Sequence, residues 1–440
     1  MAFQQGLSGL NAASKALDAT SHNIANSSTV GFKASSAHFG DVYAASLAGG
    51  GASQVGIGVN LTAIQQQFTQ GNITSTNNPL DISINGAGFF KMDQNGATTY
   101  TRNGQFHLDK NGYIVNDQSM KLTGYAAPSG IVVPSTPQPI QISASDLPPI
   151  ETGTSTSSGF TGVKANLQLD SRAKEPIVSP WVPAVVASAG PPPVTAATLY
   201  TPDPQSYNFS TAISIYDSLG NSHALTMYMV KTPTPGQWEA RFNVDGTSDA
   251  YVSPQASPVN FDSTGKLISA PVALTINLAS VNSALNLPSN ATSPMTFDVN
   301  FTGSTQFGSA FGTNRLEQDG YAAGRLVGLS VGADGIIKGR YSNGQNFAQG
   351  QIVMANFTNP NGLQSLGNNQ WVETSVSGAA MLGAPNTSSL GALSSSTVEE
   401  SNVDLTAELV NLITQQRNYQ ANAQSIKTQD QIMQTLVNLR

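Results

Sequence analysis

The two ends of the chain carry apolar side chains at regular spacing, and this repeat constrains the fold more than any other feature. Apolar residues at intervals of seven, with others three or four positions away, place one stripe along a helix. The stripe positions are Phe3, Leu7, Leu10, Leu17 and Ile24 near the start and Leu405, Leu409, Leu412, Tyr419, Ile426, Met433, Leu436 and Val437 near the end. Such a stripe packs against another helix. We therefore expect a coiled-coil pair of terminal helices that other copies of the chain complete.

Composition excludes several classes of function. Only 10% of the 440 residues are charged, the formal net charge is −7, and no run of Lys and Arg is present to meet nucleic-acid phosphates. The absence of cysteine excludes disulfides, thiolate metal sites and a cysteine nucleophile. The start lacks the pattern of a cleaved signal peptide, and no apolar run reaches the ~18 residues of a membrane span. We expect a protein that works outside the cell and binds no nucleic acid.

The bounds of the terminal helices follow from helix breakers and caps. No proline precedes Pro79 or follows Pro385, so both ends are free of the strongest breaker. The segment Ser401-Asn402-Val403-Asp404 has a capping-box pattern, which predicts a helix from Ser401 to the end of the chain. The N-terminal helix is expected to end near Ser27, ahead of Gly31.

The sequence between the helices predicts strands and hairpin turns. Apolar and polar residues alternate from Leu80 to Tyr125 and again from Tyr207 to Phe311. Four tetrads with Asp first and Gly fourth predict hairpin turns, beginning at Asp93, Asp109, Asp217 and Asp262. Calcium binding is the alternative use of such turns, but the acidic spacing of a calcium loop is missing.

We therefore expect a mainly β fold with discontinuous, nested domains. The expected domains are a helical core of residues 1–31 and 399–440, an extended connector of residues 32–76, an inner β domain of residues 77–156 and 319–398, and an inserted outer β domain of residues 157–318. The connector is rich in Gly, Ala and Gln, and residues 176–193 form a Pro-rich loop in the outer domain.

No catalytic or metal constellation emerges from the sequence. The histidines are scattered at His22, His38, His107 and His223. Ser330 stands in a Gly-x-Ser-x-Gly match, but the segment that follows predicts a hairpin and contains no histidine, so a nucleophile elbow is not expected. Tryptophans at positions 181, 238 and 371 line either a sugar groove or, as is more usual in β domains, the core. We expect no enzyme activity, cofactor, metal or small-molecule substrate.

Motifs at both ends resemble those of the bacterial flagellar rod and hook axial protein family. The N-terminal motif contains Asn23, Ala25, Asn26, Gly31, Phe32 and Lys33, and the C-terminal motif contains Ser401, Asn402, Asp404, Gln416, Arg417, Tyr419, Gln420 and Asn422. The C-terminal motif is most similar to that of hook proteins. Inner segments that resemble the same family are Leu80–Ile84, Gly88–Phe90, Arg102–Phe106 and Ala355–Phe357. We call the residues of the two end motifs the signature residues.

The resemblance implies a structural subunit of the flagellar hook. Such subunits polymerise into a curved, flexible tube that couples the rod to the filament and transmits motor torque as a universal joint. The implied location is the extracellular flagellum, reached through the flagellar type III export path. The implied partners are further copies of the chain, the rod, the hook cap, the hook–filament junction proteins and the export apparatus.

Two alternatives stay open at this point. Rod subunits share the end motifs, but they resemble shorter chains without a large second β domain. A secreted β-rich adhesin or carbohydrate-active enzyme is the more distant alternative, and proteins of the hook cap or filament do not show this pair of end motifs.

Overall fold

The computed structural model describes residues 2–42, 56–143, 146–155, 159–178, 181, 183–185, 200–387 and 389–438. The chain divides into two compact units. Unit 1 comprises Met1–Ala144, Val327–Arg340 and Asn346–Arg440, and unit 2 comprises Ser145–Leu326 and Tyr341–Gln345. The glycines at 49–51 and the prolines at 191–193 lie outside the described residues.

Strands dominate both units, which confirms the mainly β fold predicted from the sequence. The α-helices of the described residues are α1 (Ala2–Ala25), α2 (Leu278–Ala284) and α3 (Leu405–Asn438). None of these helices combines the length and the apolar character that crossing a membrane requires, within the part of the chain that is described.

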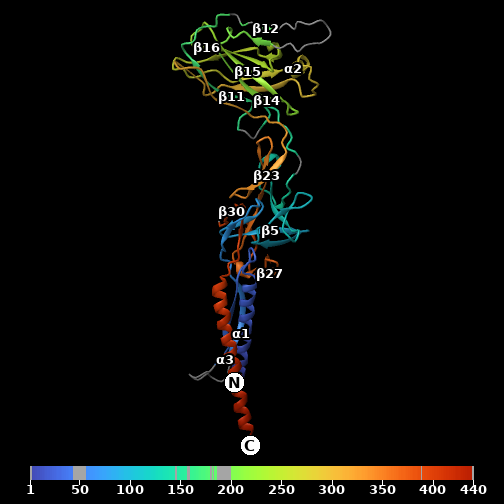
Figure 1. Ribbon diagram of the computed structural model, residues 1–440, viewed down its shortest axis with the longest axis vertical. Coiled ribbons are helices and arrows are strands. Elements are labelled where there is room, and N and C mark those ends of the chain that lie inside the picture. Colours follow the sequence, from blue (N-terminus) through green and yellow to red (C-terminus); the bar gives the residue numbers. More distant parts are fainter. Residues whose placement is uncertain are drawn as a thin grey trace. The chain divides into compact units, whose positions relative to one another are not determined.

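In unit 1, α1 and α3 lie side by side and run in opposite directions (Figure 1). Glycines of α1 face α3 at this contact. A Cβ atom at Gly6 would lie 3.0 Å from Ile426 Cγ1, and one at Gly9 would lie 2.8 Å from Asn422 Oδ1. The missing side chains therefore let the two helix backbones approach closely.

The cap of α3 differs from the one predicted. Asp404 Oδ1 accepts hydrogen bonds from the backbone N–H groups of Thr406 (2.9 Å) and Ala407 (3.1 Å), so Asp404 is the N-cap. The prediction of a cap at Ser401 was wrong. The Ser401 hydroxyl instead accepts from the N–H of Val403 at 3.3 Å, within the segment that precedes the helix.

The segment expected as an extended connector contains two paired strands. β1 (Ser35–Val42) and β2 (Gly58–Gln66) form an antiparallel ladder with Ser35 opposite Gln66. β2 also contacts α1, because the Val59 N–H donates to Ser8 Oγ at 3.3 Å. Pairing within the segment and this contact with the helix give regular structure to a stretch whose composition predicted only an extended chain.

The remaining strands of unit 1 combine both halves of the chain. They are β3 (Ile73–Ser75), β4 (Ile82–Asn85), β5 (Phe89–Gln94), β6 (Ala97–Thr101), β7 (His107–Leu108), β8 (Ile114–Val115), β9 (Lys121–Ala126), β10 (Gln138–Pro139), β23 (Leu326–Val331), β24 (Ile336–Tyr341), β25 (Asn346–Ile352), β26 (Met354–Asn356), β27 (Gln364–Gly367), β28 (Gln370–Val372), β29 (Met381–Gly383), β30 (Ala392–Ser395) and β31 (Thr397–Glu399). The main sheet has the order β23-β24-β25-β9-β5-β6-β28-β27, while β3 pairs with β31 and β4 with β30. Phe89, Tyr100, Ala355, Phe357 and Trp371 form one buried cluster of this unit.

Unit 2 packs two sheets around one large core. Its elements besides α2 are β11 (Val163–Asp170), β12 (Pro183–Val185), β13 (Tyr200–Pro202), β14 (Phe209–Tyr216), β15 (Ser222–Lys231), β16 (Gln237–Val244), β17 (Val252–Ser253), β18 (Ala256–Asn260), β19 (Val272–Ile276), β20 (Met295–Asn300), β21 (Thr305–Phe307) and β22 (Gly312–Gln318). One sheet has the order β14-β15-β16-β18, and the other contains β17-β19-β20-β11-β21 with β22 beside β11. Alternate residues of β15 and β16, such as Met227 and Trp238, are fully buried in this core.

The predicted hairpin turns are confirmed at all four tetrads. The carboxylate of each Asp accepts a hydrogen bond from a backbone N–H two to four residues ahead. The glycine of each tetrad has a positive φ, as at Gly220 (85°) and Gly265 (80°). Trp238 and Trp371 are buried, as the core interpretation predicts. Trp181 departs from it, because Trp181 is only half-buried, with its ring centroid 5.3 Å from that of Tyr228.

Candidate functional site

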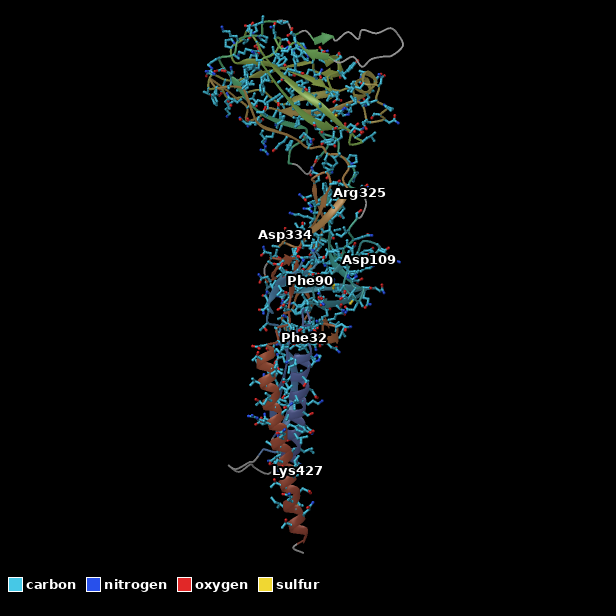
Figure 2. All side chains as sticks on the ribbon, viewed as in Figure 1. Phe32, Phe90, Asp109, Arg325, Asp334 and Lys427 are labelled. Carbon is cyan, nitrogen blue, oxygen red and sulfur yellow. The ribbon has the colours of Figure 1, made fainter. Side chains whose placement is uncertain are left out.

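The signature segments from the two ends of the chain meet in unit 1. We call residues 23–35, 69–71, 102–103 and 399–402 the junction. Figure 2 labels Phe32 there, where the helix pair reaches the strands of unit 1. The Gly31 N–H donates to the Glu399 carbonyl at 2.8 Å, so the N-terminal and C-terminal segments are joined directly.

Two asparagine side chains hold the same short stretch of backbone in the junction. Asn23 Oδ1 accepts from the Ser35 N–H at 2.8 Å, and Asn23 Nδ2 donates to the Ser35 carbonyl at 2.9 Å. Asn402 Oδ1 accepts from the Ala34 N–H at 2.8 Å, and Asn402 Nδ2 donates to the Gln67 carbonyl at 2.7 Å. An amide presents one acceptor and two donors, so it pairs with a peptide group as a neighbouring strand does. The end of α1 and the segment before α3 thus fix the start of β1 together.

A buried cluster of three charges lies beside these amides. Glu399 Oε1 accepts from Lys33 Nζ at 2.6 Å, and Glu399 Oε2 accepts from Arg102 Nη1 at 3.2 Å. Lys33 Nζ also donates to the Thr69 carbonyl at 2.7 Å, and the Gly71 N–H donates to Glu399 Oε1 at 3.0 Å. The side chains of Lys33 and Glu399 are fully buried (0% exposed), and that of Arg102 is 4% exposed. Charges are tolerated at such depth only when they are paired and hydrogen-bonded.

The electrostatics of the cluster depend on Glu399. Burial lowers the pKa of Lys33 and that of Arg102, and the carboxylate of Glu399 acts against this shift at both groups. Because the single carboxylate of Glu399 pairs with both Lys33 and Arg102, removing it would leave two buried positive charges without a negative partner. The cluster therefore forms only when segments around residues 33, 102 and 399 are in place together.

Gly31 and Phe32 complete the junction by close packing. Gly31 has a φ of +71°, and a Cβ atom there would lie 2.7 Å from the backbone nitrogen of Asn103. No other residue fits this position without a shift of the backbone. Phe32 is buried, and its ring meets the ring of His22 edge-on at 5.4 Å between centroids.

The other signature residues lie outside these contacts. Asn26 Nδ2 donates to the His22 carbonyl at 2.9 Å at the end of α1, and Ala25 is exposed. Asn422 is half-buried beside Gly9. The exposed signature residues on α3 are Gln416, Arg417, Tyr419 and Gln420.

The predicted stripe residues are only partly covered within one chain. Leu10, Leu17, Ile24, Leu412 and Ile426 are half-buried, whereas the exposed members are Phe3, Leu7, Leu405, Leu409, Tyr419 and Met433. The side chains of Leu436 and Val437 lie outside the described part. Three further apolar residues of α3 that the sequence analysis did not single out are exposed, namely Val410 (59%), Ile413 (50%) and Ile432 (55%). The helix pair therefore presents large apolar side chains that its own chain does not cover.

The Gly-x-Ser-x-Gly match does not have the geometry that a nucleophile elbow requires. Ser330 lies within β23, and the chain turns at Gly335 into the neighbouring strand β24, so the strand-to-helix turn of a nucleophile elbow is absent at this serine. Among the residues with described positions, no group of three or more His, Asp and Glu side chains gathers as metal ligands do.

Sequence reasoning missed the central residue of the junction. Arg102 was noted as part of a motif, and Glu399 received no role. The local signal is weak, because Glu399 is simply the last residue of the short strand β31 (Thr397–Glu399) in a region with few charges. Its partners are separated from it by hundreds of residues, at sequence distances of 366 for Lys33 and 297 for Arg102, so no local pattern connects them.

Comparisons with known proteins give a consistent result. Family models match four parts of the chain: the flagella basal body rod protein at residues 3–33, the flagellar hook protein FlgE/F/G D1 domain at residues 83–145, the flagellar basal body protein FlaE D2 domain at residues 187–321, and the flagellar basal body rod FlgEFG protein C-terminal region at residues 394–439.

Relatives match over the full length. Flagellar hook protein FlgE of Escherichia coli (strain K12) is 39% identical over 444 residues, and that of Salmonella typhimurium is 40% identical over 446, with 100% of both chains covered in each case. The crystal structure of Helicobacter pylori flagellar hook protein FlgE2 is similar with a TM-score of 0.50 and 15% identity, covering 73% of this chain and 98% of that one. At this identity, the structural similarity concerns the fold alone.

Proposed function

The chain belongs to the flagellar hook protein family and is a structural subunit of the bacterial flagellar hook, and we propose that it polymerises through the exposed faces of α1 and α3. The resulting tube is curved and flexible, couples the rod to the filament and transmits motor torque. The role is structural and not catalytic. The similarity to hook proteins extends over the whole of both chains, which favours a hook subunit over one of the shorter rod subunits.

The observation that carries this proposal is the uncovered apolar surface of the helix pair. Leu409, Val410 and Ile413 are each 46% or more exposed on successive turns of α3. Complete burial of a fully exposed side chain of this kind contributes about 1.5–3 kcal/mol, and covering the exposed half of each of these side chains contributes roughly half as much. Repeated in every subunit, contacts of this type supply the axial cohesion of a tube.

The junction supports the mechanical part of the proposal. Amide hydrogen bonds from Asn23 and Asn402 and the ion pairs of Glu399 tie the two helices to the strands of unit 1. A force applied to the helices therefore reaches the sheet through several short, buried contacts rather than through one flexible linker. This is the property that a torque-transmitting subunit requires.

The proposed location and partners follow from the family. The protein is a flagellar component, and within this proposal it lies outside the cell after passage through the flagellar type III export path. Its proposed partners are further copies of itself, the rod, the hook cap and the hook–filament junction proteins.

The polymerisation proposal is tested by placing a charge on the exposed face of α3. Ile413→Asp should leave the far-ultraviolet circular dichroism of the subunit unchanged, because Ile413 is 50% exposed, but should prevent tubes from pelleting in the ultracentrifuge. Asn411→Asp is the matched control, because it adds the same charge at an exposed polar position two residues away and should still give tubes. Normal tubes from Ile413→Asp would remove this face from the assembly contact.

A further inference from the structure

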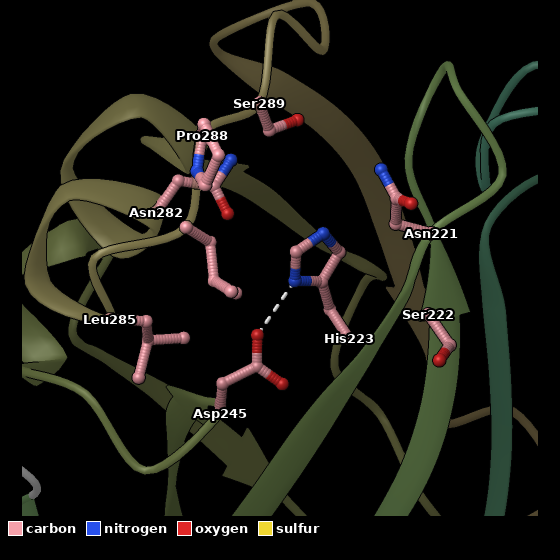
Figure 3. A pocket seen from close by; sticks show the side chains of 9 residues that line it. Asn221, Ser222, His223, Asp245, Asn282, Leu285, Pro288 and Ser289 are labelled. Carbon is pink, nitrogen blue, oxygen red and sulfur yellow. Dashed lines mark hydrogen bonds and ion pairs between the residues drawn. The ribbon is translucent and has the colours of Figure 1, made fainter.

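Unit 2 contains a buried histidine that plays no part in the assembly proposed above. His223 lies at the start of β15 beside a cavity of about 420 Å³, which Figure 3 shows from close by. The lining residues are Asn221, Ser222, His223, Asp245, Asn282, Leu285, Leu287, Pro288 and Ser289. His223 itself is only 4% exposed.

Two carboxylates from different turns flank the His223 ring. Nδ1 lies 2.6 Å from Asp245 Oδ2, the contact that Figure 3 marks with a dashed line. Nε2 makes no hydrogen bond, and its ion-pair neighbour is Asp217 Oδ2 at 3.6 Å. Asp217 belongs to the turn between β14 and β15, and Asp245 follows the end of β16. The ring therefore bridges two turns of the same sheet.

Both carboxylates are held in place from their other sides. Asp217 Oδ1 accepts from the N–H groups of Leu219 (2.9 Å) and Asn221 (2.8 Å), and Asp217 Oδ2 accepts from Asn221 Nδ2 at 2.9 Å. Asp245 Oδ1 accepts from the Ala224 N–H at 2.6 Å. Neither carboxylate can swing away from the ring without losing these bonds.

This arrangement distinguishes sharply between the two charge states of His223. The imidazolium form has an N–H on each ring nitrogen, so it donates to Asp245 and also presents a hydrogen to Asp217. The neutral form that keeps the hydrogen on Nδ1 turns the Nε2 lone pair toward the Asp217 carboxylate, which repels it. With the proton the three groups sum to a charge of −1, and without it they sum to −2 in a buried place.

We propose that Asp217, His223 and Asp245 form a proton-dependent latch, in which protonated His223 holds the β14–β15 turn to the end of β16 and loss of the proton releases that turn. The latch lies entirely within unit 2, so it does not depend on how the terminal helices assemble. The cavity beside it gives water a path for proton exchange.

The charged groups around His223 favour its protonated form, which is the closed state of the latch. The hydrogen bond with Asp245 raises the pKa of His223, burial acts against this, and the charges of Asp245 and Asp217 raise it further. From α2 and the loop that follows it, the cavity lining contributes only Asn282, Leu285, Leu287, Pro288 and Ser289, all uncharged. Glu151 is the remaining acidic neighbour, and its interaction is with Asp217.

The pH window follows from this direction. Because the folded-state pKa of His223 lies above that of an unfolded histidine, about 6.5, the latch contributes its full stability below about pH 6.5. That contribution is lost as the pH rises through the folded-state value. The latch is thus closed in mildly acidic medium and opens as the pH rises through the folded-state pKa of His223.

The charge state is tested by nuclear magnetic resonance on the full chain with ¹⁵N-labelled histidine. His223 is identified as the signal that disappears in His223→Gln, and it should titrate above about pH 6.5. In Asp217→Asn the same signal should titrate at lower pH than in the parent chain. A His223 signal that titrates at or below about 6.5, or that does not move in Asp217→Asn, would overturn the proposal.

The release step is tested by hydrogen exchange of the amides of Leu219, Asn221 and Ala224. Rates in the parent chain and in His223→Gln are compared at the same pH, so that the intrinsic pH dependence of exchange cancels. Near pH 6 the variant should exchange at least tenfold faster, and the ratio should fall toward one above the His223 titration. His107→Gln is the matched control, because His107 also lies near a carboxylate, Asp117 at 3.9 Å, but is exposed. A ratio that is the same at every pH would show a packing role only and would contradict the latch.

Discussion

At the scale of single residues, the junction depends on polar groups that are buried away from water. Asn23 is 2% exposed and Glu399 is 1% exposed, so water cannot replace the bonds that they make. An unsatisfied buried polar group costs about 1–3 kcal/mol, and an unpaired buried charge costs more. The stability of unit 1 therefore rests on a few side chains from distant parts of the sequence.

Glu399→Gln should destabilise unit 1 strongly. The variant keeps the shape of the side chain but leaves Lys33 and Arg102 as two buried cations without a carboxylate. Breaking a buried ion pair in this way costs about 3–5 kcal/mol. Urea unfolding followed through the fluorescence of Trp371, in a chain with Trp181 and Trp238 replaced by Phe, should show a lower midpoint.

The neighbouring residue offers a control for this experiment. Glu400 is exposed, so Glu400→Gln should change the free energy of unfolding by less than about 0.5 kcal/mol. The double variant Lys33→Met with Glu399→Gln removes one of the two uncompensated cations and should recover part of the loss. If Glu399→Gln unfolds at the same urea concentration as the parent chain, the charge cluster does not stabilise the junction.

Features encoded within a few neighbouring residues could be predicted from the sequence, whereas contacts between distant residues could not. Hairpin turns such as Asp217 to Gly220 are encoded within four residues, and the structure confirms them. The signature residues Asn23, Lys33 and Asn402 were identified by resemblance, but their contacts with Ser35, Glu399 and Ala34 are set by the tertiary fold. A residue such as Glu399, whose partners lie hundreds of positions away, cannot be recognised from its local context.

At the scale of elements, the two terminal helices are predictable but their contact face is not. Both helices lie close to their predicted bounds, because breakers and caps are local signals. The heptad spacing drew attention to large residues, whereas two glycines of α1, Gly6 and Gly9, lie against Ile426 and Asn422 of α3. Small residues permit close helix packing without adding to an apolar count, so periodicity alone does not identify this face.

Ile426→Asp should separate the helix pair. The Ile426 side chain is half-buried against Gly6, and a carboxylate at this position would lose its hydration against the α1 backbone. We expect the amides of α1 to lose protection in hydrogen exchange and tubes to be absent from the pellet. Gln424→Asp places the same charge on an exposed position of α3 and should retain the protection of α1. Full protection of α1 in Ile426→Asp would contradict the packing described here.

At the scale of the whole molecule, most of unit 2 is one long insertion in the sequence of unit 1. The sequence placed the inserted domain at residues 157–318, whereas the compact unit runs over Ser145–Leu326 and includes the turn Tyr341–Gln345. Unit 2 is longer than the predicted domain because the chain segments that enter and leave the insertion pair with each other. Isolated bridges join Leu147 to Gly324 and Ile150 to Tyr321, and pairing of this kind is not visible in a Pro-rich sequence.

Because of this pairing, we expect that unit 2 can be deleted without preventing unit 1 from folding. Leu147 and Gly324 exchange two backbone hydrogen bonds, of 2.7 and 3.1 Å, so the entry and exit of the insertion lie opposite each other. Cα atoms of such a pair are about 5.5 Å apart, a gap that a linker of two or three glycines spans. Deleting residues 147–324 should therefore leave unit 1 able to fold, with the fluorescence of Trp371 still that of a buried indole.

The deletion also separates assembly from the properties of unit 2. Because the exposed stripe of α1 and α3 is retained, the shortened chain should still form tubes visible by electron microscopy, and it should lack the pH-dependent exchange of the His223 latch. Insertion of the same glycine linker into the exposed turn at Asn95-Gly96 of the full chain is the control for any effect of the linker itself. A deletion chain that folds but does not assemble would show that unit 2 is required for polymerisation. A chain that does not fold would show that unit 1 depends on the insertion, against the division into two units.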